Sequence, residues 1–358
     1  MTPLLWPALI YLALVVLHLA LPARRVEGYV VDPLTGEKLR YRLNGLAVTA
    51  VALACWAMSC RLGWAAWDAF YLHRWEMVAG ACVPGVALTL AIVMPVRTRS
   101  SNGLLRDLYL GRLENPRWGS RVLDAKVVLY LAGAVMLELN VLSFTAHHVL
   151  THGADPSAGV FLYAAGFSFF VFDYLTFEEV HLYTYDFMAE KVGFKLVWGC
   201  LVFYPFFYCI GLWNLAGASD PHTSPVLLAI YALTFLAGWV LSRGANLQKF
   251  QFKRDPAARA FGFLDPAAVS AGGKHVLTGG FWGLSRHINY LGEILMAVGL
   301  TLSLGYPQAP VPWLYPLYYV VLLFPRQADD DRRCAARYGA LWQEYCRRVP
   351  YRIIPYLY

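Results

Sequence analysis

Nine predominantly apolar segments recur along this 358-residue chain, and they constrain its fold more than any other feature. A helix that crosses a bilayer needs about 20 mostly apolar residues. Only 15% of the residues are charged, against about 25% in a typical soluble domain. We therefore predict an all-α, polytopic membrane bundle and exclude a disordered chain or an ordinary water-soluble globule. The predicted spans are 5–21, 46–60, 78–96, 127–147, 160–176, 192–213, 226–241, 290–306 and 311–324.

The basic residues indicate how these spans are oriented. If successive connections alternate between the two sides of the membrane, all Lys and Arg residues except Arg61 and Arg74 fall on one side. Basic residues accumulate on the cytoplasmic side, so we expect the C-terminus in the cytoplasm and the N-terminus opposite. The net charge of +7 then reflects topology, and we expect membrane lipids as partners and no nucleic acid. The membrane is the cytoplasmic one in a bacterium or the endoplasmic reticulum in a eukaryote.

Seven cysteines are scattered through the chain without a Cys-x-x-Cys pair or a zinc spacing. Five fall inside apolar runs, and Cys334 and Cys346 fall in the basic tail. Such an odd, scattered set is typical of small buried hydrophobes. We expect neither a disulfide framework nor a metal site.

Several ionisable or polar residues lie inside the predicted spans. Glu138, Asn140 and Asp173 are in mid-span, and Glu178 and Glu179 end the fifth span. Charge at membrane depth is costly, so such groups are candidates for function; a neutral carboxyl that joins two helices by a hydrogen bond is the alternative. Neighbours on a helix point about 100° apart, so at most one of the two adjacent glutamates should face a given cavity.

Two stretches after the seventh span have the residue types of a polar binding site. Lys249 and Lys253 are four residues apart and share a helix face. They suit a pyrophosphate or a 2′-phosphate, although a basic flank that merely sets topology is the alternative. The stretch 279–293 combines glycines, which allow close backbone approach, with four side chains for stacking and hydrogen bonding. These are Trp282, Arg286, His287 and Asn289.

The tail beyond the last span begins with Arg326 and then has three consecutive aspartates, 329–331. Arg326 and Asp330 are again four residues apart. A helix cap explains one of these acids, whereas three consecutive carboxylates indicate that this turn binds another group. Tyr345 and its aromatic neighbours suit either a pocket or an interfacial aromatic belt.

These motifs together resemble the sterol carbon–carbon double-bond reductases, the family of Δ14-, Δ7- and Δ24(28)-reductases that includes the lamin B receptor. The resemblance is nearly continuous over 280–293 and the ending Val-Pro-Tyr-Arg-Ile-Ile-Pro-Tyr-Leu-Tyr. It extends through Arg-Tyr-Arg-Leu-Asn-Gly at 40–45 and Gly-Arg-Leu-Glu-Asn-Pro-Arg at 111–117. Family members usually have ten spans, so we expect the family's first span to be absent here.

The resemblance implies NADPH as cofactor and a sterol from the bilayer as substrate. The alkene is protonated and the resulting cation receives a hydride. The implied domain is 1–358, with 1–243 mainly scaffold and sterol side and 244–358 the NADPH side. Tyr208 is the implied proton donor, with Glu179 or Asp330 as its proton source. The implied cofactor residues are Lys249, Lys253, Trp282, Arg286, His287, Asn289, Arg326, Asp330 and Tyr345.

Three alternatives stay open. The ending of the chain is most similar to the Δ14 branch, but Δ7 and Δ24(28) reduction are possible. The second alternative is a membrane methyltransferase that uses S-adenosylmethionine. Such enzymes have an Arg-His-Pro-x-Tyr element, which is similar to Arg-His-Ile-Asn-Tyr at 286–290 here, and an acidic, Tyr-rich tail. A non-catalytic scaffold is the third reading. The chain also carries Cys200, Pro325 and Asp329 where the family usually has an acid, a His and an Arg.

Overall fold

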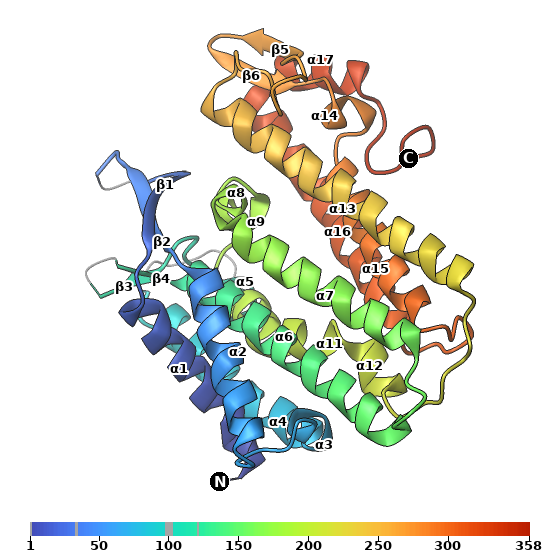
Figure 1. Cartoon of the computed structure of the whole chain (residues 1–358). Helices are drawn as coiled ribbons and strands as arrows, with labels where there is room; N and C mark the ends of the chain where they lie inside the picture. Colours follow the sequence, from blue (N-terminus) through green and yellow to red (C-terminus); the bar gives the residue numbers. More distant parts are fainter. Residues whose placement is uncertain (1, 33–34, 97–102, 120–121) are drawn as a thin grey trace. The chain divides into compact units, whose positions relative to one another are not determined.

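The computed structural model describes residues 2–32, 35–96, 103–119 and 122–358, so parts of the predicted basic loop 96–126 lie outside the described residues. The described chain is mainly helical, with short antiparallel hairpins. It forms two compact units, Met1–Asp220 and Pro221–Tyr358 (Figure 1). The predicted all-α class is thereby confirmed.

The first unit is built around α6 (Ala125–His152), which is buried along most of its length. Asp124 begins this helix because its side chain accepts hydrogen bonds from the backbone of Lys126 and Val127, as an N-cap does. The other elements of this unit that precede its broken sixth span are η1 (Pro3–Leu5), α1 (Trp6–Ala20), β1 (Arg24–Val31), β2 (Lys38–Leu43), α2 (Gly45–Arg61), α3 (Ala69–Leu72), α4 (Arg74–Val93), α5 (Leu104–Leu110), β3 (Arg117–Trp118), β4 (Leu123–Asp124), α7 (Ala158–Thr176), α8 (Glu178–His181) and α9 (Tyr185–Met188).

The predicted sixth span, 192–213, is helical but broken. It divides into α10 (Phe194–Trp198), a π-helical turn (Gly199–Phe203), α11 (Tyr204–Phe207) and α12 (Ile210–Leu215). Pro205 has no backbone N–H and cannot continue a regular helix. Its carbonyl oxygen accepts a 2.8 Å hydrogen bond from Asn140 Nδ2 on α6. Broken backbone inside a membrane is tolerated where protein satisfies it in this way.

The second unit contains α13 (Pro225–Arg254), the hairpin of β5 (Ala268–Ala271) and β6 (Lys274–Leu277), α14 (Phe281–Leu284), α15 (Ile288–Ser303), α16 (Leu314–Tyr338) and α17 (Ala340–Arg348). Helices α13 and α15 cross closely: a Cβ at Gly238 would lie 2.6 Å from the Gly292 carbonyl oxygen. Small residues permit such contacts between membrane helices. With 30 residues, α13 is about 45 Å long and exceeds the roughly 30 Å apolar core of a bilayer. We therefore expect its last turns, which carry the charged residues Lys249, Lys253 and Arg254, to lie outside the apolar core.

Helix length and hydropathy support a multi-pass membrane protein. Among the described residues, five helices are long and apolar enough to cross a bilayer: Pro3–Ala20, Arg74–Val93, Ala125–His152, Ala158–Thr176 and Pro225–Arg254. Gly45–Arg61, Phe194–Phe207 and Ile288–Ser303 are shorter apolar helices. All nine predicted segments are largely helical, while the number that cross the membrane stays a prediction.

Candidate functional site

The end of α13 carries two lysines, and one of them lies over the ring of Trp282. The Lys249 ammonium lies 5.2 Å from the centroid of the Trp282 ring. The indole Nε1 donates a 2.8 Å hydrogen bond to the Ala245 carbonyl, which fixes the plane of the ring. Lys253 acts electrostatically with Lys249, Arg337 and Asp330. This part of the second unit is therefore a cation cluster beside an aromatic plate.

A glycine turn places Trp282 against α13. Gln248 spans this turn: its Nε2 donates to the Gly279 carbonyl at 3.1 Å, and its Oε1 accepts from the Phe281 backbone at 3.0 Å. Gly280 has a φ of +60°, and a Cβ there would lie 2.4 Å from Gln248 Nε2. Glycine is required here by both backbone conformation and space.

Arg286 binds the C-terminal tail to α16. Its Nη1 donates to Asp331 Oδ2 at 3.1 Å and to Cys346 Sγ at 3.0 Å, and its Nη2 donates to the Pro350 carbonyl at 3.2 Å. Gln327 Nε2 donates to the same Asp331 oxygen at 2.6 Å. The contacts of Arg286 thus fix the architecture of the site, and Asp331 is a residue that sequence reasoning did not single out.

The three consecutive aspartates have three different environments. Asp329 pairs with Arg332 at 3.2 Å and Arg333 at 2.9 Å on the exposed side of α16. Asp330 acts electrostatically on Lys253, and Asp331 is directed at Arg286. The rotation of about 100° per residue explains the separation. Only the last two contribute to the candidate site.

Tyr345 lies in a buried cluster behind Trp282. Its hydroxyl donates a 3.2 Å hydrogen bond to the Trp282 carbonyl, and burial raises its pKa. Helix α17 packs on the β5–β6 hairpin through Val269, Leu341, Trp342, Tyr345 and Val349. Tyr345 therefore packs inside the protein and stabilises the position of Trp282, rather than belonging to an interfacial aromatic belt.

Several buried polar atoms of the second unit have no hydrogen-bond partner among the described residues. They include Asn289 Oδ1, His287 Nε2 and Asp331 Oδ1. His287 Nε2 is 3.8 Å from Asp331 Oδ1, beyond hydrogen-bond distance. Such atoms are costly unless something binds them. With the adjacent cations and indole, these donors and acceptors fit a ligand that carries phosphates, ribose hydroxyls and an amide, as NADPH does.

The other predicted cofactor residues are less fully defined by contacts. Arg326 begins the polar half of α16, one residue after Pro325 and four before Asp330. Arg337, which sequence reasoning missed, is exposed on α16 and acts electrostatically on Lys253. Its spacing from Lys253 in the sequence gives no signal for this proximity.

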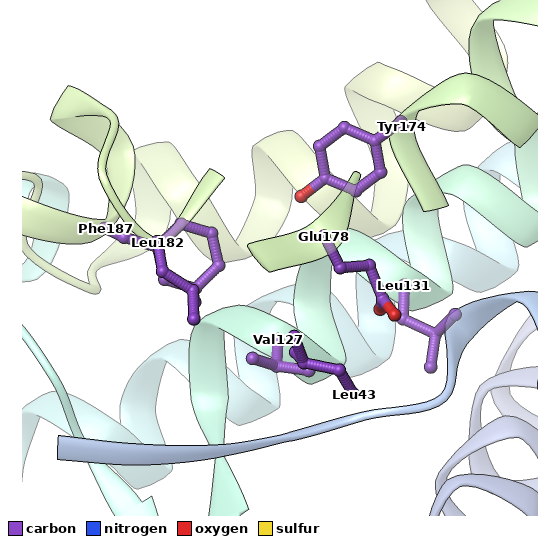
Figure 2. A pocket seen from close by; sticks show the side chains of 7 residues that line it. All are labelled: Leu43, Val127, Leu131, Tyr174, Glu178, Leu182 and Phe187. Atoms are coloured by element: carbon purple, nitrogen blue, oxygen red, sulfur yellow. The ribbon is translucent and has the colours of Figure 1, made fainter. Parts of the chain in front are cut away.

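The predicted proton donor Tyr208 and one of its two predicted proton sources, Glu179, lie in the first unit, whereas the other, Asp330, lies in the second. The Tyr208 carbonyl accepts a 3.3 Å hydrogen bond from Tyr163, and its ring is 4.6 Å from that of Tyr204. Glu178 lines a pocket (Figure 2). Glu179 Oε2 lies instead 3.8 Å from Arg24. Of the two adjacent carboxyls only that of Glu178 is among the residues that line this pocket, in line with the expectation that at most one of them faces a given cavity.

We expect Asp331→Asn to destabilise the protein, because it leaves the largely buried Arg286 without a compensating charge. Burial alone would raise the pKa of Asp331, but His287 and Arg286 outweigh it and lower the pKa. The ion pair therefore stabilises the folded protein at pH values above the ordinary carboxyl pKa of about 3.9. This stabilisation is lost as the pH falls through the lower pKa that Asp331 has in the folded protein. At pH 7 Asp331→Asn should lower the free energy of unfolding by about 2 kcal/mol, measured as a lower Tm in detergent. An unchanged Tm would contradict the role of the ion pair.

Comparison with known proteins gives a match over almost the whole chain. The model of the "Ergosterol biosynthesis ERG4/ERG24 family" matches residues 4–358. The chain is 34% identical over 348 residues to a Delta(14)-sterol reductase of Arabidopsis thaliana, covering 94% of this chain and 91% of that protein. It is 32% identical to the Delta(14)-sterol reductase of Methylotuvimicrobium alcaliphilum, covering 94% and 79%. The mouse Delta(14)-sterol reductase TM7SF2 is 33% identical, covering 98% and 84%.

Proposed function

The chain belongs to the ergosterol biosynthesis ERG4/ERG24 family, and we propose on this basis that it reduces the Δ14 double bond of a sterol with NADPH. The observation that carries the proposal is the similarity, over more than nine-tenths of this chain, to proteins named Delta(14)-sterol reductase. Family membership makes the protein an oxidoreductase of sterol biosynthesis. Its site has the cations and the aromatic plate that a dinucleotide requires.

The residues of the second unit divide into groups that hold the cofactor and groups that position them. NADPH supplies a hydride when bound. Lys249 and Lys253, with Arg337, would hold its phosphates through charge-assisted hydrogen bonds. Trp282 would stack on a planar ring, His287 and Asn289 would bind ribose or amide groups, and Arg326 and Asp330 would complete the cofactor-binding set. Arg286 and Tyr345 act mainly by fixing the tail and Trp282.

The first unit supplies the proton in this proposal. An alkene without an adjacent carbonyl is not polarised, so reduction begins with protonation of one carbon. Tyr208 Oη gives up its proton, and the π-electron pair of the alkene forms the new C–H bond with it. A tertiary sterol cation remains. Addition of a hydride to this cation would complete the two-electron reduction. Exclusion of water from an apolar site protects the cation.

The sterol enters from the bilayer, and the arrangement of basic residues supports a cytoplasmic C-terminus. We propose that 1–243 provides mainly the scaffold and the sterol side, and 244–358 the NADPH side. The boundary between the two compact units falls earlier in the sequence, between Asp220 and Pro221. Helix α13 belongs to the second unit, and only its last turns carry cofactor residues.

Purified protein should reduce a Δ8,14-diene sterol with NADPH, and mass spectrometry should detect a product two mass units heavier. A Δ5,7-diene and a Δ24(28) alkene, assayed in parallel, identify the bond. Reduction of only one of these two would assign the chain to another branch of the family. If none of the three is consumed, the proposed function is wrong.

Thermal stabilisation distinguishes the main alternative class. A ligand that binds the folded state raises Tm, by an amount that grows with the ratio of its concentration to Kd. We expect NADPH to raise Tm and S-adenosylmethionine to leave it unchanged. The opposite pattern would support a methyltransferase, and no response to either would favour a scaffold.

A further inference from the structure

A pocket in the first unit contains a carboxyl that the proposed reaction has not yet used. It is small and partly open, about 10 Å³, which is room for about one water molecule. Five apolar residues and two polar ones form its lining: Leu43, Val127, Leu131, Leu182 and Phe187, with Tyr174 and Glu178 (Figure 2). A lining of this kind keeps a carboxyl in an apolar environment while leaving it accessible.

Glu178 is held firmly in this pocket by the start of α2. Its Oε2 accepts a 3.1 Å hydrogen bond from the Gly45 backbone. Asn44, the residue that would ordinarily cap α2, is engaged elsewhere: its Oδ1 lies 2.6 Å from His18 Nδ1, and its Nδ2 donates to the His18 carbonyl. Glu178 therefore caps α2 from a distant part of the chain.

A series of tyrosines leads from this carboxyl toward Tyr208. Tyr174 lines the same pocket, and its ring packs 6.2 Å from Tyr130 of α6. Tyr204 lies over Gly133, where a Cβ would be 2.5 Å from its ring. Positions 130 and 133 share a face of α6 because they are three residues apart. Tyr174 of α7 and Tyr204 of α11 thus both pack along this face of α6, and Tyr204 is among the groups that act electrostatically on Tyr174.

The last step of the series is the contact between the rings of Tyr204 and Tyr208, whose centroids are 4.6 Å apart. Glu178 is also among the groups that act electrostatically on Tyr174. A carboxyl and three phenols, all able to donate and accept protons, therefore follow one another from the pocket to the proposed proton donor.

We propose that Glu178 supplies the proton that Tyr208 delivers to the sterol, by way of Tyr174 and Tyr204. This inference rests on the proposed function. In the reaction, Tyr208 loses its proton to the alkene carbon and becomes a phenolate. Successive transfers restore its O–H bond and move the deficit to Glu178, which takes a proton from water. Glu178 is a positioning residue, since it acts through the tyrosines.

The charges around Glu178 are compatible with this role. Burial raises the pKa of Glu178 to about 7, although the Gly45 hydrogen bond and the charge of Arg24 lower it. Asp186 also acts electrostatically on Tyr174. Near neutral pH the carboxyl is therefore available in both its protonated and its ionised form, as a group that must be reloaded requires.

Glu178→Gln tests the inference, because the amide oxygen still accepts from Gly45 and preserves the cap. With full-length protein, NADPH and the Δ8,14-diene, we expect turnover to fall at least about tenfold. The KM for NADPH should stay within about twofold, since no cofactor contact changes. The solvent deuterium isotope effect should rise as proton supply becomes limiting. Glu178→Asp should recover part of the turnover.

Glu27→Gln is the matched control, because it removes an exposed carboxyl that pairs with Arg40 on the β1–β2 hairpin. Normal turnover or an unchanged isotope effect in Glu178→Gln would overturn the inference. So would a greater loss of turnover in Glu179→Gln than in Glu178→Gln. Failure of the wild-type protein to reduce any sterol would instead refute the proposed function itself.

Discussion

Tyr208→Phe should abolish sterol reduction, with turnover falling by about 10² to 10⁴-fold, the usual contribution of a general acid. The substitution removes one hydroxyl and keeps the ring, so the contact with Tyr204 is retained. NADPH binding should be nearly unchanged, because the predicted cofactor residues all lie in the second unit. Turnover with the Δ8,14-diene and titration of NADPH by protein fluorescence would measure the two effects.

Two further tyrosine variants make this result specific. Tyr109→Phe removes the hydroxyl of an exposed tyrosine on α5 and should behave as wild type. Tyr163→Phe removes the hydrogen bond to the Tyr208 carbonyl and should lower turnover less than Tyr208→Phe does. Full turnover in Tyr208→Phe would show that another group protonates the alkene.

Replacing Lys249 and Lys253 together by Met should weaken NADPH binding by at least about 10²-fold. Each charge-assisted hydrogen bond to phosphate contributes about 1.5–3 kcal/mol, and 1.4 kcal/mol is a tenfold change in Kd. Met keeps the length and apolar stem of the side chain, so α13 should stay intact. Calorimetric titration with NADPH in detergent measures the change.

NADH and a neighbouring cation complete this experiment. If the two lysines hold the 2′-phosphate, the double variant should bind NADH about as well as wild type does; if they hold the pyrophosphate, both cofactors should lose affinity. Arg254→Met is the control, because Arg254 lies in the same last turn but stacks over Phe250. Unchanged NADPH affinity in the double variant would show that these cations only set topology.

Much of the candidate cofactor site could be predicted because its residues are close in sequence. A helix brings positions 249 and 253 to one face by its own geometry. The stretch 279–293 needs only a glycine turn to present its polar side chains. By contrast, Arg286 and Asp331 are 45 residues apart, and nothing local indicates that they pair. The same holds for Arg337 beside Lys253.

The amino-acid sequence by itself determined the class of fold and the family. Apolar runs of bilayer length demand helices because backbone groups in lipid must be satisfied within the segment. Tertiary structure alone decided what each of several adjacent acids contacts. Glu178 rather than Glu179 lines the pocket, and Asp331 rather than Asp329 meets Arg286. Neighbouring residues differ by a rotation of about 100°, and only the packing of distant helices determines which direction is inward.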